Sequence, residues 1–331
     1  MKYSDIDFNK KTVLITGGAG FIGSNLAFYF QENYPECKVI VFDKFRSEET
    51  FSNGNLKSFG HFKNLIGFKG IVISGDITDK EDINKLREYD IDYIFHEAAI
   101  SDTTVADQKI MIDTNVNAFK DLCDLAVQKN ASMIYASSGA TYGGSDRFSV
   151  GYEKPNNVYG FSKLMMDNLA KEYYDKIRIV GLRYFNVYGP REYFKNKTAS
   201  MVLQFGLQLL KGESAKLFER SDRILRDFIY VEDVIQANIK ACAAQHCGVY
   251  NVGTGKARSF QDIVDILKKE LNIERKDIYI PNPYVGQYQF FTQADIADTK
   301  KYLGYEPKFE LEGGIKAYLP EIIRIYEEEV K

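Results

Sequence analysis

The 331-residue sequence predicts an α/β fold, in which a doubly wound parallel sheet is followed by a smaller mixed α/β lobe. Short runs rich in β-branched residues alternate with longer helical patterns through the first half of the chain. Parallel strands need crossover connections, which are usually helices, so this alternation indicates a parallel sheet. The alternation weakens after about residue 185, which predicts where the smaller lobe begins.

The expected strands are short apolar runs bounded by turn residues. In chain order they are TVLIT at 12–16, KVIVFD at 38–43, GIVISGD at 70–76, YIFHEAA at 93–99, SMIYASS at 132–138 and IRIVGLRYFNV at 177–187. The expected helices include 24–34, 114–130 and 202–213, each with apolar residues on one face. The stretch RDFIYVEDV at 226–234 predicts a strand followed by a helix.

Composition excludes several classes of protein. A net charge of −3 gives no basic patch for nucleic acid. No apolar run approaches the ~20 residues of a membrane helix, and the polar N-terminus lacks the apolar core of a signal peptide. The four scattered cysteines and three histidines indicate neither a disulfide framework nor a His-rich metal site. We therefore expect a cytoplasmic protein with no metal, nucleic-acid or membrane partner.

A glycine-rich turn follows the first expected strand and opens the first helix. Gly17, Gly20 and Gly23 permit a tight turn, close approach of a pyrophosphate, and close packing of helix on strand. The helix N-terminus offers free N–H groups to phosphate. Asp43 ends the next strand at the expected spacing of about 20 residues. This context predicts a Rossmann-type dinucleotide site, and the alternative is merely a tight turn.

The residues after the second strand leave the identity of the dinucleotide open. Asp43 suits a free ribose 2′-hydroxyl and favours NAD. Lys44 and Arg46 follow it directly, and a cationic pair there could hold the 2′-phosphate of NADP.

Tyr159 and Lys163 form the second constellation, in NVYGFSK. Four residues apart, they share one face of a helix. A nearby ammonium and an oxidised nicotinamide both favour phenolate, so we expect the pKa of Tyr159 to fall below its usual value of about 10. Ser138 ends the fifth strand, where it could donate to a substrate oxygen or simply cap the next element. The alternative for the pair is an exposed helix face.

Together, TGGAGFIGSN, YASSGATYGG, NVYGFSK, RYFNVYGPRE and RDFIYVEDV resemble the extended short-chain dehydrogenase/reductases that modify nucleotide sugars. The likeness runs over the chain after its first ten residues. Within that family the sequence is similar to the ADP-heptose 6-epimerases. The segments that carry this finer likeness are HEAAISDTT, EKPNNVYGFSK, FNVYGPRE followed by K-x-x-x-A-S, SAKLFE, VYNVGTGKARSF and YQFFTQAD.

The resemblance implies NADP as the cofactor, with NAD possible, and a set of contacts beyond the glycines. These are Phe21, Ile22, Asp43, Lys44, Lys80, Glu97, Ala98, Ala99, Ile100, Ser101, Asn115, Tyr159, Lys163 and Val187. With NADP as the cofactor, Arg46 is also expected to bind it. The segment 47–63 is longer than in the family, so no cofactor contact is carried over onto it.

The resemblance also implies a nucleotide-sugar site. Its residues are Asn186, Lys195, Phe218, Glu219, Arg220, Ser221, Arg226 and Tyr288. Lys197 and Gln204 belong to the same region but depart from the family, in which Ser and His stand at these positions. Arg226 could grip a pyrophosphate with its planar fork.

The implied reaction is epimerisation at carbon 6 of ADP-D-glycero-D-manno-heptose, through a 6-keto sugar, for lipopolysaccharide. The two epimers point their hydroxyl to different sides, so a second proton-handling group across from Tyr159 is useful, and Lys195 is the family's candidate. To act as a base it needs a lowered pKa, through burial or through Arg191 and Lys197. The family also implies a homo-oligomer, a pentamer.

Other functions remain open. A UDP-sugar 4-epimerase would use Ser138, Tyr159 and Lys163 without Lys195. A 4,6-dehydratase needs an Asp-Glu pair where Gly139 and Ala140 stand. A catalytically inactive cofactor-binding regulator would not need the intact Ser138, Tyr159 and Lys163 set. We expect the NADP-binding domain at 1–185, with 228–255 returning to it, and the substrate-binding lobe at 186–227 and 256–331.

Overall fold

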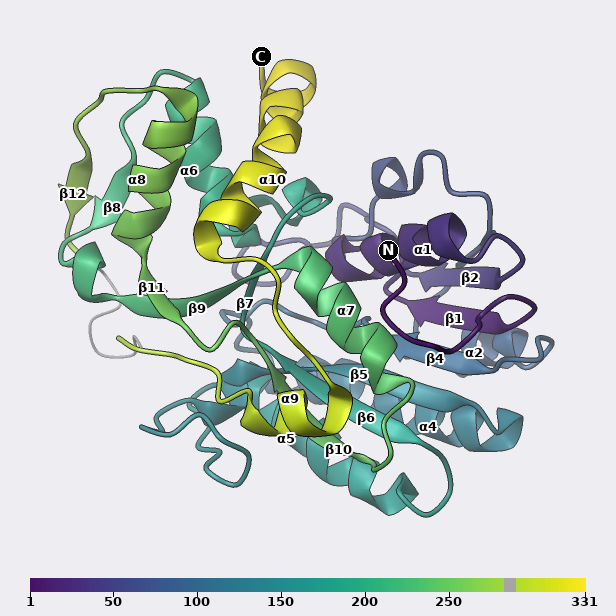
Figure 1. The fold of residues 1–331 in the computed structure, drawn as a ribbon. Helices are drawn as coiled ribbons and strands as arrows, with labels where there is room; N and C mark the ends of the chain where they lie inside the picture. The colour runs from purple at the N-terminus through teal and green to yellow at the C-terminus, as the bar shows by residue number, and fades with distance from the viewer. Residues whose placement is uncertain (283–289) are drawn as a thin grey trace.

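The computed structural model describes residues 1–282 and 290–331, and its centre is a seven-stranded parallel sheet (Figure 1). The order is β3-β2-β1-β4-β5-β6-β10, and every neighbouring pair is parallel. The strands are β1 (Thr12–Thr16), β2 (Lys38–Asp43), β3 (Ile71–Ser74), β4 (Tyr93–His96), β5 (Ser132–Ser138), β6 (Ile179–Tyr184) and β10 (Gly248–Val252). The order reverses between β1 and β4, as in Rossmann-type sheets. The predicted fold class is confirmed.

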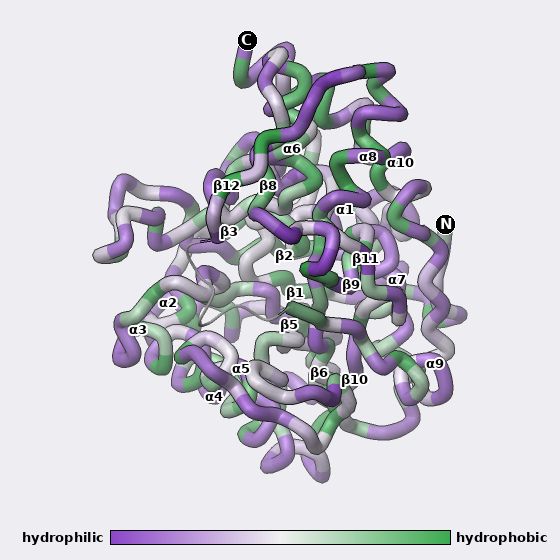
Figure 2. The backbone as a smooth tube through the Cα atoms, turned by 90° about the vertical axis from the view of Figure 1, so that its left-hand side faces the viewer, coloured by the Kyte–Doolittle hydropathy of each residue, from purple (hydrophilic) through white to green (hydrophobic). Residues whose placement is uncertain are grey.

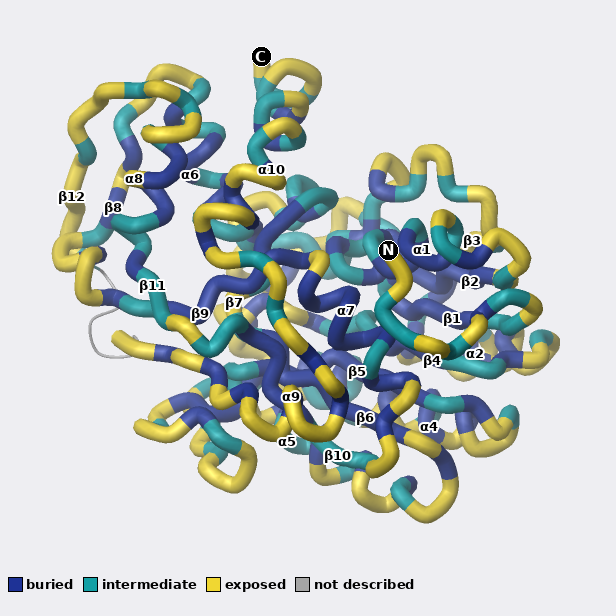
Figure 3. Tube along the Cα trace, in the orientation of Figure 1, coloured by how far each residue is buried: buried dark blue, intermediate teal, exposed yellow. Residues whose placement is uncertain are grey.

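Helices cover both faces of this sheet, which is what doubly wound means. Val13 and Ile15 of β1 join one buried cluster with α1 (Phe21–Asn33) and α7 (Val231–Ala241). Leu14, between them, joins another cluster with α4 (Ala118–Lys129) and α5 (Val158–Ala170). Because successive residues of a strand point to opposite faces, one strand serves both cores. The central strands are accordingly buried (Figure 3).

Shorter helices complete the layers around the main sheet. They are α2 (Lys80–Leu86), α3 (Gln108–Ile112) and α9 (Ala297–Leu303).

A smaller lobe lies beyond the carboxyl ends of the strands. It contains a sheet of β7 (Asn186–Tyr188), β9 (Leu225–Tyr230) and β11 (Ala257–Ser259), and a pair of β8 (Lys216–Phe218) with β12 (Ile278–Ile280). A third buried cluster joins α6 (Met201–Leu210), α8 (Phe260–Leu271) and α10 (Leu311–Ile325). Figure 2 shows hydrophobic residues gathered along these helices and along the central strands.

Several predicted boundaries were wrong. The strand expected at 177–187 is two strands in different sheets, because β6 ends at Tyr184 and β7 begins at Asn186. Between them, the Phe185 N–H donates to the carbonyl oxygen of Val252 at 3.1 Å, where the chain passes into the smaller lobe. β3 and β4 are shorter than expected, and α4 is preceded by a π-helical turn at Asp113–Asn117.

A buried ion pair joins β6 to α5. Arg183 on β6 is 2 % exposed, and its Nη2 lies 2.8 Å from Oδ2 of Asp167 on α5. Its Nη1 lies 2.6 Å from Oε1 of Glu153 and donates to the Tyr142 hydroxyl at 3.0 Å. Tyr135 of β5 donates to Asp167 at 3.1 Å. These contacts fix α5 against two strands.

Across residues 1–282 and 290–331, none of the helices has the length and apolar character needed to span a lipid bilayer. In the same described residues, no three His, Cys, Asp or Glu side chains are grouped so as to hold a metal ion.

Replacing Arg183 should destabilise the fold strongly. Arg183→Met leaves Asp167 buried without its cation, so we expect the free energy of unfolding to fall by about 3–5 kcal/mol, measured by urea denaturation. Lys120→Ala, which removes an exposed i,i+4 ion pair with Asp124, should cost less than about 1 kcal/mol. Similar losses in the two variants would contradict the assigned role of Arg183.

Candidate active site

A cavity of about 310 Å³ opens along the carboxyl ends of the parallel strands. Ligands of open α/β sheets bind at this edge, at the point where the strand order reverses. The wall includes the glycine turn, groups from β2, β5 and α5, the residues that follow β4, and Lys195. The predicted residues that line it are Gly17, Gly20, Phe21, Ile22, Gly23, Asp43, Lys44, Glu97, Ala98, Ala99, Ile100, Ser101, Ser138, Tyr159, Lys163, Val187 and Lys195.

The glycine turn has no room for side chains. Gly17 has φ +68°, and a Cβ on it would lie 2.7 Å from the Ala98 nitrogen. A Cβ on Gly23 would lie 2.3 Å from the Gly17 carbonyl oxygen, so α1 packs directly on the turn. Gly20 begins α1 without a side-chain cap, which leaves the helix N-terminus available to an anion. This cradle fits the pyrophosphate of a nicotinamide dinucleotide.

Asp43 and Lys44 stand at the far end of the cavity. The carboxylate of Asp43 is 5 % exposed and accepts from the N–H of Ala19 at 2.9 Å and of Phe45 at 2.7 Å. Burial raises the pKa of Asp43, and these backbone hydrogen bonds oppose the rise. The Lys44 ammonium lies 2.7 Å from Oδ2 of Asp76. The Asp43 carboxylate is thus partly engaged with the glycine turn itself.

The longer segment 47–63 contributes to the same wall. Its lining residues are Phe51, Leu56, Lys57, Ser58, Phe59 and Gly60. None of them was predicted from the sequence, because the segment carries no motif. The one available signal was the apolar character of Phe51, Leu56 and Phe59 within a polar stretch.

Arg46, which we predicted to bind the cofactor, does not line the cavity. Its Nη2 donates to the Phe194 carbonyl oxygen, and its guanidinium lies 5.7 Å from the centre of the Phe194 ring. The His61 ring stacks on the same phenyl group, with centroids 3.7 Å apart. Arg46 therefore tethers the residue that precedes Lys195.

Tyr159, Lys163 and Ser138 meet at the other end of the cavity. Asn157 caps α5 by accepting the Gly160 N–H at 2.8 Å, so Tyr159 lies in the first turn and Lys163 one turn later. Lys163 is 2 % exposed and donates to the Ala136 carbonyl oxygen at 2.7 Å. Ser138 hydrogen-bonds the Tyr159 phenol and also accepts the Ala140 N–H at 3.1 Å. The expected cap is present, and donation from Ser138 to a substrate oxygen stays a prediction.

Burial sets the pKa values of this pair. It lowers the pKa of Lys163 to about 8, while Glu97 and Asp167 oppose the shift. Burial also raises the pKa of Tyr159, and the Ser138 hydrogen bond opposes that rise. Without a bound nucleotide, burial therefore holds the pKa of Tyr159 above its usual value, and the Lys163 Nζ lies 6.0 Å from the ring centre. The expected lowering of this pKa, which includes the charge of an oxidised nicotinamide, stays a prediction.

Glu97 follows β4 and lines the cavity together with Tyr159 and Lys163. Its Oε1 accepts the Tyr184 hydroxyl at 2.9 Å, and Asn238 donates to that hydroxyl at 2.8 Å. Its Oε2 is buried and has no hydrogen-bond partner in the described part of the chain. Burial raises the pKa of Glu97 to about 7, against the effects of Tyr184 and Lys163.

Lys195 lies on the short 3-10 segment Tyr193–Thr198 and reaches the same cavity. Its Nζ is 5.5 Å from the centre of the Phe21 ring. Burial lowers the pKa of Lys195, and Glu192 opposes this. The expected contribution of neighbouring cations is wrong, because Arg191 donates to the Asn64 carbonyl oxygen at 2.6 Å and Lys197 is exposed.

The remaining predicted residues lie outside the cavity wall. Lys80 is exposed at the start of α2, and Asn115 holds the Ile100 backbone through hydrogen bonds of 2.8 and 3.0 Å. Gln204 donates to the Ala199 carbonyl oxygen at 2.7 Å. The others are exposed Asn186 and Lys197, and the small-lobe residues Phe218, Glu219, Arg220, Ser221 and Arg226.

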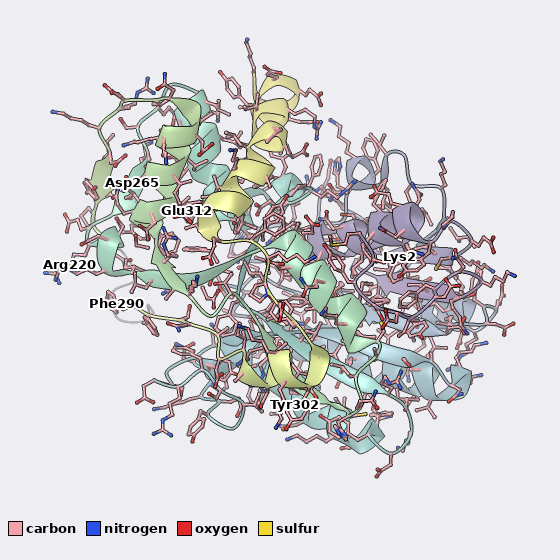
Figure 4. All side chains as sticks on the ribbon, viewed as in Figure 1. Lys2, Arg220, Asp265, Phe290, Tyr302 and Glu312 are labelled. Atoms are coloured by element: carbon pink, nitrogen blue, oxygen red, sulfur yellow. The ribbon has the colours of Figure 1, made fainter. Side chains whose placement is uncertain are left out.

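Figure 4 shows Arg220 at the outer edge of the small lobe, and Tyr288 lies outside the described residues. The substrate contacts assigned to the small lobe stay predictions.

Comparison with known proteins places the cavity in context. The model of the NAD dependent epimerase/dehydratase family matches residues 13–253. The structure is similar to that of ADP-L-glycero-D-manno-heptose-6-epimerase from Helicobacter pylori, with TM-score 0.90 and 52 % identity over 98 % of this chain and 99 % of that one.

More distant structures share the same fold. UDP-glucose 4-epimerase from Thermotoga maritima, solved with UDP-glucose, has TM-score 0.84 and 27 % identity over 96 % of this chain and 100 % of that one. A mutant UDP-glucuronic acid 4-epimerase from Bacillus cereus, solved with NAD, has TM-score 0.80 and 26 % identity over 95 % and 100 %.

Glu97 should make stability pH-dependent. Its pKa is about 7 in the fold and about 4.3 in an unfolded chain, so its contribution to stability is present below the lower value and lost as pH rises through the higher one. Glu97→Gln should therefore gain about 2 kcal/mol over the parent protein between pH 5 and pH 7.5, measured by urea denaturation. Exposed Glu88→Gln is the control, and an equal gain there would refute the assignment.

Proposed function

Because the chain belongs to the NAD dependent epimerase/dehydratase family, we propose that it epimerises carbon 6 of ADP-D-glycero-D-manno-heptose to give ADP-L-glycero-D-manno-heptose. One observation carries the proposal. Lys195 lines the same cavity as Tyr159 and Ser138, so two proton-handling groups reach one space from different elements. The 52 % identity to an ADP-heptose epimerase supports the same substrate.

The residues of the catalytic end suit removal of hydride from a secondary alcohol. A bound oxidised nicotinamide would accept that hydride, return it later, and supply a positive charge that favours phenolate. Tyr159 takes the proton of the carbon-6 hydroxyl, and Ser138 donates to the same oxygen to hold it in place. Lys163, anchored on the Ala136 carbonyl, places its charge beside the phenol. The sugar becomes a 6-keto intermediate.

Inversion requires the second face of that ketone. When the keto sugar turns its other face to the same hydride donor, its oxygen points away from Tyr159. Lys195 then gives the proton, and it takes the proton in the reverse direction. Burial lowers the pKa of Lys195, which increases the neutral fraction that a base needs near pH 7.

We propose NADP as the cofactor, with NAD as the alternative. Two cations, Lys44 and Lys57, line the same cavity as Asp43, and a bound 2′-phosphate would need positive charge. Asp43 already accepts two backbone N–H groups, which weakens the argument for NAD from a free acid at this position. Release of the bound nucleotide and mass spectrometry distinguish the two.

The second candidate function is epimerisation at carbon 4 of a UDP-sugar, which the likeness to the Thermotoga maritima enzyme favours. That reaction would not require Lys195 as a proton donor or acceptor. A dehydratase is disfavoured because Gly139 and Ala140 carry no acid or base. The family resemblance further supports a role in lipopolysaccharide synthesis and assembly as a homo-oligomer, which light scattering would measure.

The purified protein is expected to carry NADP and to interconvert the two carbon-6 epimers of ADP-glyceromanno-heptose. Chromatography of the sugar nucleotide after incubation measures the epimer ratio. A ratio that stays unchanged with cofactor bound excludes this function, and conversion of UDP-glucose under the same conditions would favour the second candidate.

Lys195→Met should lower turnover by about 10²–10⁴-fold, because general acid–base groups contribute on this scale. Cofactor binding should survive, since the glycine cradle is untouched, and absorbance of the bound nucleotide measures it. Lys197→Met is the matched control: the exposed Lys197 should affect substrate KM more than kcat. Equal loss of kcat in both variants would remove the case for Lys195 as the second base.

A further inference from the structure

Glu192 is buried at the base of the segment that carries Lys195, residues 189–200. It is 0 % exposed. Its Oε1 accepts the Gly189 N–H at 3.2 Å and the Ser200 hydroxyl at 2.7 Å, and its Oε2 accepts the Ser200 N–H at 2.6 Å. One carboxylate thus joins both ends of the segment.

These contacts favour the charged form of Glu192. The Ser200 oxygen accepts the Leu203 N–H at 3.3 Å as the cap of α6, so its own proton is available to Glu192. Each carboxylate oxygen therefore accepts a hydrogen bond. If Glu192 were protonated, its own O–H would face one of these donor groups. Burial raises the pKa of Glu192, while Lys195 and the Ser200 and Gly189 hydrogen bonds lower it.

Glu192 and Lys195 belong to the same turn. The Lys195 backbone N–H donates to the Glu192 carbonyl oxygen at 2.9 Å, and the negative charge of Glu192 opposes the lowering of the Lys195 pKa by burial. Other titratable groups share the cavity wall at greater separation along the chain: Asp43, Lys44, Lys57, Asp76, Glu97, Asp102, Tyr159, Lys163 and Tyr184. Tyr188 of β7 and Tyr318 of α10 also adjoin Glu192.

We propose that Glu192 is a positioning residue for Lys195, which closes the 189–200 segment under the amine and keeps a negative charge beside it. The proposal rests on the proposed function, because it takes Lys195 as the second proton-handling group. Without Glu192, burial would lower the pKa of the amine unopposed, and a smaller fraction of Lys195 would carry the proton that it must give to the keto oxygen.

The test titrates Lys195 directly in the cofactor-loaded protein. Reductive methylation with ¹³C-formaldehyde labels the lysines, and Lys195→Arg identifies the Lys195 signal by its loss from the NMR spectrum. In Glu192→Gln, the midpoint of the Lys195 titration should fall by about one pH unit, because an opposite charge is removed. Glu192→Met should lower the Lys195 midpoint by the same amount. It replaces the Gln variant if that variant does not fold, because it places no amide N–H groups opposite the Ser200 and Gly189 donors.

Ser200→Ala is the matched control, because it removes the hydrogen bond from the Ser200 hydroxyl to Glu192 and keeps the charge of Glu192. It should leave the Lys195 midpoint unchanged, although turnover can fall. The alkaline limb of the pH profile of kcat, measured in the direction in which Lys195 gives its proton, should move to lower pH in the neutral Glu192 variants alone. An unchanged midpoint in these variants, or an equal fall in Ser200→Ala, overturns the proposal. The titration needs no sugar substrate, so failure of the proposed function would appear separately, as an inactive parent protein.

Discussion

The buried ion pair between Arg183 and Asp167 is the contact on which the catalytic geometry depends. Asp167 lies one helical turn beyond Lys163 on α5, and both partners are 2 % exposed. In such a site neither charge has water as an alternative partner, so separation of the pair is costly. The pair therefore fixes the rotation and position of α5 on the sheet. Tyr159 and Lys163 inherit that position, because they project from the same helix.

In the cavity beside this helix, burial is the main cause of the shifted pKa values. Burial disfavours charge, so it lowers the pKa of Lys163 and Lys195 and raises that of Glu97 and Tyr159. These shifts bring two amines and one acid nearer to neutral pH, where groups that exchange protons work best. The packing of the cavity is therefore sufficient to produce these pKa shifts.

The segment with Lys195 is held by contacts from several distant parts of the chain. Arg46 and His61 grip Phe194, Gln204 holds the Ala199 carbonyl, and Glu192 joins the two ends. The His61 N–H also donates to the Ala19 carbonyl oxygen at 3.0 Å, within the glycine turn. The segment after β2 thereby connects the glycine turn to Lys195, the proposed second base.

Local sequence determined the glycine turn, most strand positions, the fold class, and the pairing of Tyr159 with Lys163 on one helical face, because each depends on residues close together in the chain. Tertiary structure decided the rest. The break at Phe185 depends on Val252, the lining role of 47–63 depends on where that segment lies against the sheet, and Arg46 faces Phe194 instead of the cavity. The directions of the pKa shifts at Tyr159 and Lys195 depend on burial, which is a property of the whole fold and of no single motif.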